Sequence, residues 1–497
     1  MSGGGVEVGL PSMAWSPSVV AADPARIART SQVYVNRNLD LAGVELVGFD
    51  MDYTLALYNQ RRIEDLSIRE TLRLLCAKRD YPAAVRQIEF DPSLGMRGLV
   101  IDQRLGNVLK TDRHGTPGRV LHGHTHLSAA RAGELYQRER TSSSDPRYAR
   151  IDSLYALPEV VLYLTLTEYF ETHAGPDPAR LWQDIRECVD LAHRDGSIKS
   201  SVCAEVSEFV ERDPALAETL HRFRSAGKRL FLLTNSDWAY VERVMSYLLD
   251  GVLPAYPGWR SYFDVVVVSA RKPQFFTAQE PFAELDGQGQ PLPQAPRGPF
   301  LRGRVYAGGN VREFELRAES RGNRVLFVGD HIYGDMLRSR KSSTWRTAMI
   351  LQELEHEVRI HDGLAPALRR LDELERQLRG LDTEIADRRA LLRSLQRGVH
   401  ACGQEVAGAK LALRRTLDVL REELRARTAE VAQLESQLDA AFNPTWGPLF
   451  REGHEISQFG EQVEAYACLY TSRMSNFRFY SPNHHFRGPR DRMAHER

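Results

Sequence analysis

The sequence predicts an α/β fold built on a parallel sheet of the Rossmann type, with an inserted α/β domain and a helical C-terminal extension. Four short apolar runs carry this prediction, at residues 44–49, 229–235, 263–270 and 324–330. They are nearly continuous in apolar residues, as in strands that are buried on both faces of a parallel sheet. Helical patterns separate the later runs, and every run ends in polar residues. This order is typical of an open sheet that binds its ligand at the carboxyl ends of the strands.

The spacing of these runs predicts the domain organisation. Far more chain lies between the first and second runs than an α/β connection needs, so residues 60–205 are expected to form an inserted domain. Because the chain leaves the core for this segment and returns to it at the predicted ligand-binding edge, the segment is a candidate cap. The core then consists of residues 33–59 and 206–360, and residues 1–32 are expected to form a flexible N-terminal segment. Residues 281–310 are rich in proline and glycine, which indicates a long surface excursion.

A helical extension is predicted from residue 361 to 497. Leucine and other aliphatic residues recur there at three- and four-residue steps in two series, as in paired amphipathic helices. Gly398, Gly403 and Gly408 separate the two series, which favours an antiparallel coiled-coil hairpin near 364–440 over one continuous rod. An intramolecular prop is the favoured role of this hairpin, and oligomer contact is the main alternative.

Bulk composition excludes several classes of protein. Hydrophobic residues make up 42% and charged residues 27% of the 497 residues, as in an ordinary globular protein. Lysine plus arginine and aspartate plus glutamate each number 66, so net charge gives no reason to expect a nucleic-acid or membrane partner. The five cysteines form no Cys-x-x-Cys pair, and no apolar run approaches the roughly 18 residues that span a bilayer. A signal-peptide pattern is not found, so a reducing cytoplasm is the expected location.

Two carboxylates follow the first predicted strand, in the stretch GFDMDYTL. Side chains two residues apart on an extended chain point the same way, so Asp50 and Asp52 are expected to enter one crevice. A buried carboxylate is costly unless it is paired, protonated or bound to a metal. Asp330 and Asp335 follow the fourth run and add oxygen ligands of the kind that Mg²⁺ prefers. Lys272 follows the third run and adds a positive charge, so the set predicts a phosphoryl-transfer site.

These elements resemble the four-part signature of the haloacid dehalogenase (HAD) superfamily: Asp-x-Asp-x-Thr, Thr or Ser after a strand, Lys, and Gly-Asp-x-x-x-x-Asp. Longer stretches look like the cytosolic purine 5′-nucleotidase family, among them VYVNRNLDLAGVELVGFDMDYTLALY (33–58), GKRLFLLTNSDWAY (227–240) and FVGDHIYGDMLRSRKSSTWRT (327–347). The likeness covers most of residues 33–350. It implies hydrolysis of purine nucleoside 5′-monophosphates, IMP and GMP above all, with Mg²⁺ as the cofactor.

The resemblance implies a role for each matching residue of the core. Asp50 would attack phosphorus and form an aspartyl-phosphate, and Asp52 would protonate the leaving ribose oxygen and later deprotonate the hydrolytic water. Mg²⁺ would be held by Asp50, by the backbone carbonyl of Asp52 and by Asp330. Asp335 would support the ion indirectly. The residues expected to bind phosphoryl oxygens or substrate at this edge are Thr234, Asn235, Ser236 and Lys272.

The same resemblance implies that the inserted segment carries the nucleoside-binding residues. The stretch DIRECVDLAHRDGSIK (184–199) matches the recognition helix and loop of the family. Arg186, Asp190 and His193 are four and then three residues apart, so they would share one helical face. Lys199 falls on the matching position in the loop.

A further match concerns the base. Tyr155 corresponds to an aromatic residue that stacks on the purine. Its neighbour Ala156 replaces a family asparagine that contacts the base, which leaves the preference for guanine or hypoxanthine open.

Several alternatives stay open at the level of sequence. The same aspartyl-phosphate could pass its phosphoryl group to a nucleoside, which would make the chain a nucleoside phosphotransferase. A weakly active nucleotide-sensing or scaffold protein is an alternative of another class. The stretch HGHTH (122–126) is expected to be a polar loop rather than a zinc site, because no fourth ligand lies nearby. Members of the family can be tetramers, so a homo-oligomer, either a dimer or a tetramer, is expected.

Overall fold

The computed structural model describes residues 26–136, 141, 145–337, 343–397 and 404–490. It divides into two compact units, the first made of Met1–His356 and Leu449–Arg497 and the second of Glu357–Pro448. Most of the predicted N-terminal segment 1–32 lies outside the described residues.

A nine-stranded sheet forms the core of the first unit, in the order β1-β19-β16-β15-β3-β11-β12-β14-β13. The strands are Tyr34–Val35 (β1), Leu46–Phe49 (β3), Arg229–Leu233 (β11), Val265–Val268 (β12), Phe282–Leu285 (β13), Val305–Gly308 (β14), Val325–Gly329 (β15), Arg346–Ile350 (β16) and Leu469–Thr471 (β19). The outermost pairs, β1 with β19 and β13 with β14, are antiparallel, and the other pairs are parallel. The predicted α/β fold with a parallel sheet is confirmed.

The four apolar runs of the sequence become β3, β11, β12 and β15, which are neighbours at the centre of this sheet. All four residues of β3 are buried, as are those of β12 and β15. β12 consists of four valines, whose branched side chains suit a strand that packs on both faces.

Helices connect the strands of this sheet. α7 (Ala215–Ser225) precedes β11, α8 (Trp238–Leu249) follows it, and α9 (Val311–Ala318) precedes β15. The carboxylate of Asp237 accepts a hydrogen bond from the backbone N–H of Tyr240 at 3.1 Å and caps α8. The helix therefore begins directly after the polar turn that ends β11. α11 (Glu353–Gly363) follows β16, and α14 (Gln458–Tyr466) precedes β19.

The segment predicted as an insertion contains a five-stranded antiparallel sheet in the order β8-β7-β6-β5-β9. Its strands are Leu99–Asp102 (β5), Asn107–Thr111 (β6), Pro117–His122 (β7), Thr125–His126 (β8) and Tyr148–Arg150 (β9). The helices around it are α1 (Gln60–Lys78), α2 (Ala129–Tyr136), α3 (Leu157–Thr172), α4 (Pro178–Arg194), α5 (Ser197–Ala204) and α6 (Val206–Phe209). Where the chain enters and leaves this segment, β4 (Leu57–Tyr58) pairs with β10 (Val210–Glu211).

Two sequence predictions need correction. Residues 281–310 are not simply a surface excursion, because β13 and β14 within them extend the core sheet. Residues 361–497 do not form a single extension, because Leu449–Arg497 belongs to the first unit and β19 lies between β1 and β16. These strands are three or four residues long, and their pairing partners are distant in sequence, so local pattern does not reveal them.

The C-terminal part of the first unit also forms two small ladders. β2 (Leu39–Asp40) pairs with β20 (His485–Phe486), and β17 (Arg451–Glu452) pairs with β18 (Glu455–Ile456). The first of these joins residues near the two ends of the chain.

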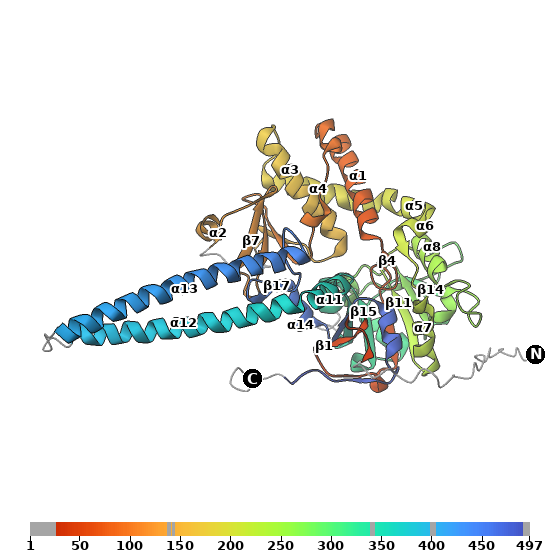
Figure 1. The fold of residues 1–497 in the computed structure, drawn as a ribbon. Coiled ribbons are helices and arrows are strands. Elements are labelled where there is room, and N and C mark those ends of the chain that lie inside the picture. The colour runs from red at the N-terminus through yellow and green to blue at the C-terminus, as the bar shows by residue number, and fades with distance from the viewer. Residues whose placement is uncertain (1–25, 137–140, 142–144, 338–342, 398–403, 491–497) are drawn as a thin grey trace, which may run out of the picture. The chain divides into compact units, whose positions relative to one another are not determined.

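The second unit contains two long helices, α12 (Ala365–Arg397) and α13 (Gln404–Phe442), which lie side by side in Figure 1. Ile385 packs with Leu417 and Leu420, and Arg370 forms a 2.8 Å ion pair with Glu430, so the two helices run antiparallel. Gly398 and Gly403 lie outside the described residues. In the part of the chain that the structure describes, no helix has both the length and the apolarity to cross a membrane.

Candidate active site

Four neighbouring strands deliver polar residues to one edge of the core sheet. β3 leads into Asp50, β11 into Thr234 and β15 into Asp330, and Lys272 follows β12. Because β15, β3, β11 and β12 run parallel, their carboxyl ends meet at this edge. The backbone N–H of Asp50 continues the ladder by donating to the carbonyl of Val328 at 2.8 Å.

A lysine and three carboxylates form the centre of the site. Lys272 Nζ lies 2.9 Å from Asp50 Oδ2 and 2.7 Å from Asp335 Oδ1. Oxygen atoms of Asp50, Asp330 and Asp335 lie within 4.8 Å of one another. All four side chains are buried, and one ammonium cannot balance three ionised carboxylates. Hard oxygen ligands and excess negative charge are the chemistry that a Mg²⁺ ion requires, so this donor set fits that ion.

Burial and neighbouring charges shift the protonation of these groups. Burial raises the pKa of Asp50 to about 6, because the attraction of Lys272 offsets the loss of water only in part. Burial also raises the pKa of Asp330, and the charges of Asp335 and Asp50 add to this effect. Burial opposes the charge on Lys272, but Asp335 and Asp50 outweigh it and raise the pKa of the lysine. The lysine therefore stays charged while the carboxylates need additional positive charge.

Hydrogen bonds hold both oxygens of the Asp52 carboxylate. The hydroxyl of Tyr58 donates to Oδ1 at 2.5 Å, and the hydroxyl of Ser236 donates to Oδ2 at 2.7 Å. The hydroxyl of Tyr240 lies 2.8 Å from that of Tyr58. Burial raises the pKa of Asp52, and the negative charge of Asp50 raises it further. Asp52 is thus fixed in position and biased toward its protonated form.

The turn after β11 holds the backbone of Lys272 through hydrogen bonds. Asn235 Oδ1 accepts a hydrogen bond from the backbone N–H of Lys272 at 2.5 Å, and its Nδ2 donates to the backbone carbonyl of Lys272 at 2.9 Å. The buried hydroxyl of Thr234 accepts from the backbone N–H of Ser236 at 3.2 Å. The side chain of Asn235, next to the buried Thr234, therefore fixes the position of Lys272.

Aromatic rings lie beside the carboxylates on the side of the inserted segment. The ring of Tyr155 packs edge-on against Tyr53 at 4.8 Å and against His193 at 5.6 Å between centroids. Burial lowers the pKa of His193, so the imidazole is neutral near pH 7. Lys199 Nζ lies 2.5 Å from a carboxylate oxygen of Asp237, the residue that caps α8. Because Tyr53 directly follows Asp52, these rings continue from the carboxyl edge of the core sheet into the inserted segment.

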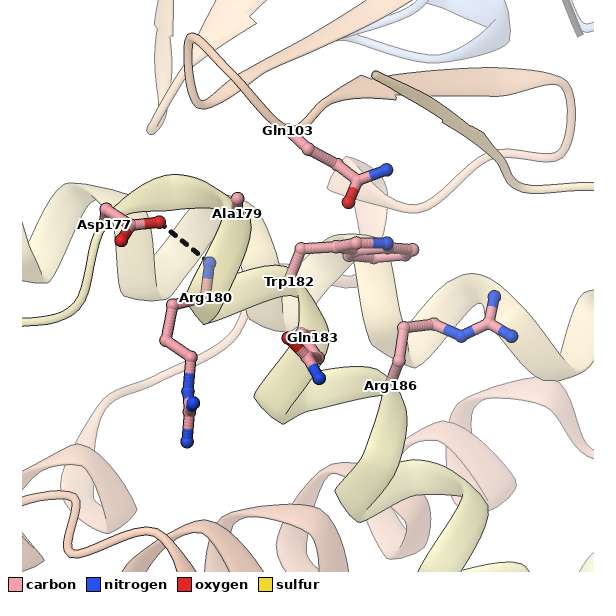
Figure 2. Close-up of a pocket in the computed structure, with 7 residues that line it drawn as sticks. All are labelled: Gln103, Asp177, Ala179, Arg180, Trp182, Gln183 and Arg186. Atoms are coloured by element: carbon pink, nitrogen blue, oxygen red, sulfur yellow. Dashed lines mark hydrogen bonds between the residues drawn. The ribbon is translucent and has the colours of Figure 1, made fainter. Parts of the chain in front are cut away.

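Arg186 has different neighbours from His193, although both lie on α4. Its guanidinium is 3.4 Å from the carboxylate of Glu159 and 5.7 Å from the centre of the Trp182 ring. Arg186 and Trp182 line a hollow of about 530 Å³. Figure 2 shows both side chains, with Gln103 facing the indole ring. Burial raises the pKa of Glu159 to about 7, despite the opposing effect of Arg186.

Asp190 is exposed on α4, one turn before His193. The structure thus brings Tyr155, His193 and Lys199 closer to Asp52 at the edge of the core sheet than Arg186 and Asp190.

The histidines of the stretch 122–126 contact different partners. His122 Nδ1 lies 2.8 Å from Asn107 Oδ1, whereas His124 Nε2 lies 3.2 Å from Thr165 Oγ1. The expected polar loop is the turn of a β-hairpin, because His122 ends β7 and His126 lies in β8. Among the described residues, these histidines form no group of three ligands that could hold a metal.

Sequence reasoning missed Tyr58, Tyr240 and Glu159, and it also missed Arg97. The guanidinium of Arg97 is buried and donates to the backbone carbonyl of Asp330 at 3.0 Å. A tyrosine in a short apolar strand is weak as a sequence signal, because most such tyrosines belong to a hydrophobic core. A buried arginine has no local signal at all, since its partners come from distant parts of the chain.

Comparisons with known proteins place the chain in a family. The model of the 5′ nucleotidase family matches residues 33–497. A 5′-nucleotidase domain-containing protein of Dictyostelium discoideum is 28% identical over 474 residues, covering 93% of this chain and 74% of that protein. The 5′-nucleotidase domain-containing protein 2 of Homo sapiens is 29% identical over 484 residues, covering 93% and 85%.

Solved structures with partial similarity include the 2-haloacid dehalogenase from Pseudomonas syringae, at 16% identity and a TM-score of 0.22. That alignment covers 62% of this chain and 86% of the dehalogenase. The family match itself extends from β1 through the candidate site to the C-terminal segment. The chain therefore belongs to the 5′ nucleotidase family and is a phosphoric monoester hydrolase.

Proposed function

We propose that this hydrolase is a Mg²⁺-dependent 5′-nucleotidase that acts on purine nucleoside 5′-monophosphates through an aspartyl-phosphate on Asp50. One observation carries the proposal: Lys272 Nζ lies between the carboxylates of Asp50 and Asp335, with Asp330 beside them. A nucleophile, a fixed cation and spare oxygen ligands at one point are what transfer of a phosphoryl group requires.

In the first step, a carboxylate oxygen of Asp50 attacks phosphorus and the bond from phosphorus to the ribose 5′ oxygen breaks. Asp50 must be ionised for this step, and with a pKa of about 6 it is largely ionised at neutral pH. The leaving oxygen takes a proton from Asp52, whose raised pKa favours the protonated form. Lys272 stabilises the negative charge of the phosphoryl oxygens.

In the second step, water attacks the phosphorus of the aspartyl-phosphate and inorganic phosphate is released. Asp52, now ionised, accepts a proton from this water, which restores its starting state. Tyr58 and Ser236 hold the Asp52 carboxylate in one orientation through both steps. The cycle thus uses one residue as acid and then as base.

Asp50 and Asp330 are the residues that would hold Mg²⁺, with the backbone carbonyl of Asp52, and Asp335 would support them. The bound ion would supply positive charge against the phosphate and lower the charge of the carboxylate cluster. The rings of Tyr155 and His193, which adjoin Tyr53 beside the catalytic edge, support a nucleoside as the leaving group. A flat base suits contact with such rings, and Lys199, which pairs with Asp237, is the nearby cation that we propose for polar contact with the substrate.

The test is phosphate release from a panel of purine and pyrimidine nucleoside 5′-monophosphates, with and without Mg²⁺. We expect Mg²⁺-dependent release with a preference for purines, and its loss in Asp50→Asn, which keeps the shape of the side chain. Full activity of Asp50→Asn would overturn the mechanism. Adding inosine separates hydrolysis from transfer to a nucleoside, since a phosphotransferase would form IMP instead of releasing phosphate.

A further inference from the structure

Arg97 is a buried arginine of the inserted segment that contacts the loop of Asp330. Its side chain is fully buried. Its Nε donates to Glu353 Oε1 at 2.7 Å, one terminal nitrogen donates to Glu353 Oε2 at 2.5 Å, and the other donates to the backbone carbonyl of Asp330 at 3.0 Å. The ring of Phe459 covers the guanidinium at 4.9 Å.

The chain around Arg97 is shaped for this contact. Gly98 has φ +84°, and a Cβ atom at that position would lie 2.6 Å from Phe459 Cβ. The left-handed backbone lets the chain turn into β5 immediately after Arg97. The backbone N–H of Gly98 also donates to the carbonyl of Ile151, which ties the turn to the five-stranded sheet of the inserted segment.

Stability alone is a weak explanation for such a buried pair. Removing a guanidinium and a carboxylate from water costs about as much as their attraction returns, and an apolar pair of similar volume often serves equally well. An arginine fork differs from an apolar pair in one respect: it fixes several acceptors in one plane. Here the acceptors are Glu353, at the first residue of α11, and the carbonyl of Asp330.

We infer that Arg97 is a positioning residue for the metal site, which holds Asp330 in place through its backbone and ties that loop to the inserted segment. The inference rests on the proposed Mg²⁺ site, in which Asp330 is a ligand. Residues outside the coordination sphere that orient a ligand typically change metal affinity about 10- to 100-fold when they are altered. Docking of the inserted segment on the core and affinity for the ion are then linked through one side chain.

A second arginine provides a matched control. Arg147 donates from Nε to Asp102 Oδ1 at 2.8 Å and from a terminal nitrogen to Oδ2 at 2.6 Å, and its pair is also largely buried. Asp102 is the last residue of β5 and lies roughly 10 Å along the strand from Leu99, its first residue. Leu99 comes two residues after Arg97. Both arginines bind a carboxylate through two nitrogens, but the Arg147–Asp102 pair belongs to the five-stranded sheet of the inserted segment.

The experiment compares Arg97→Lys with Arg147→Lys in the full chain. Lysine keeps the charge of each site and removes the planar fork. Two quantities are measured: the Mg²⁺ concentration that gives half-maximal phosphate release, and the rise in Tm that Mg²⁺ produces without substrate. We expect Arg97→Lys to need about 10- to 100-fold more Mg²⁺ by both measures, with kcat at saturating Mg²⁺ largely recovered. Arg147→Lys is expected to lower Tm without changing the Mg²⁺ requirement.

Each outcome decides the inference. An unchanged Mg²⁺ requirement in Arg97→Lys, or an equal change in both variants, overturns it. If Arg97→Lys does not fold, Glu353→Gln is compared with Arg147→Lys by the same two measurements. Glutamine keeps one acceptor oxygen but weakens the interaction with the guanidinium of Arg97. Failure of the proposed function is a separate result, since it would show as absence of Mg²⁺-dependent phosphate release in the unaltered protein.

Discussion

At the scale of single residues, Asp52 shows how the site separates two carboxylates that are two positions apart. Asp50 is paired with Lys272, whereas Asp52 accepts neutral hydroxyl donors from Tyr58 and Ser236. An ammonium favours the ionised carboxylate, and burial among neutral groups favours the protonated one. The environments therefore suit Asp50 to the role of nucleophile and Asp52 to that of acid and base.

Replacing Tyr58 with phenylalanine tests whether its hydroxyl positions Asp52. The change removes a hydrogen bond to a carboxyl group that becomes negatively charged as it gives up its proton. A hydrogen bond to a charged group is worth about 1.5–3 kcal/mol, or roughly 10- to 160-fold in rate. We expect this loss in kcat for a nucleoside monophosphate, whose alkoxide leaving group needs a proton. The loss should be much smaller for p-nitrophenyl phosphate, whose leaving group needs none.

Tyr240→Phe is the control for this prediction, because its hydroxyl contacts that of Tyr58 and not the carboxylate of Asp52. A smaller effect is expected from it. Equal losses on both substrates in Tyr58→Phe would show that the hydroxyl acts on the structure of the site in general.

At the scale of elements, the packing of β3 against β11 depends on a residue without a side chain. Gly48 pairs in register with Phe231, and a Cβ atom on Gly48 would overlap the Phe231 ring. That ring contacts Phe314 at 4.8 Å between centroids in the main core. The glycine therefore creates the space for an aromatic core above the strand that leads into Asp50.

We expect Gly48→Ala to lower the free energy of unfolding by about 1–3 kcal/mol or more, because overpacking a core forces side chains out of their rotamers. Urea denaturation at constant pH measures this loss. Adding Phe231→Leu should restore part of it by making room for the methyl group. Gly43→Ala is the control, since a Cβ atom there has nothing within 4 Å; similar losses in both variants would contradict the packing argument.

The contact between α3 and α4 predicts a dependence of stability on pH. Glu159 on α3 has a pKa of about 7 in the folded protein and an ordinary value of 4.5, because burial outweighs the attraction of Arg186. The folded state thus holds the proton more tightly, and the stability from this group is fully present below pH 4.5 and lost as pH rises through 7. The difference between the two pKa values corresponds to roughly 3 kcal/mol in the free energy of unfolding.

Glu159→Gln removes this titration. We therefore expect the stability of the variant relative to the unaltered protein to increase by up to about 3 kcal/mol between pH 5 and pH 8. Denaturation of both proteins at the two pH values measures the difference. A constant difference would mean that Glu159 is ionised throughout and is stabilised by Arg186.

Elements also explain how far the sequence could predict the structure. Strands β3, β11, β12 and β15 are apolar runs followed by polar residues, so local pattern predicts both the strands and the edge where Asp50, Lys272 and Asp330 meet. Tyr58 and Arg97 could not be predicted in this way. Their importance depends on which distant group accepts their hydrogen bonds, and that is decided by the packing of separate segments.

At the scale of the whole molecule, the chain folds as two units of different construction. The residues proposed for catalysis, metal binding and substrate binding all lie in the first unit, which the C-terminal segment completes through β19. The second unit is held together by contacts between α12 and α13, among them Ile385 with Leu417 and Leu420. A change inside the helical pair should therefore leave the chemistry of the first unit intact.

Leu417→Asp tests this independence. Leu417 is 2% exposed, and a carboxylate without a partner at that position should destabilise the pairing of α12 and α13 by about 3 kcal/mol or more. We expect limited proteolysis to cut the helical pair while nucleotide hydrolysis persists. Val419→Asp, two residues away on the same helix and 67% exposed, should change neither property. Loss of hydrolysis in Leu417→Asp alone would show that the paired helices act on the site, which would make the second unit part of the enzyme rather than a separate prop.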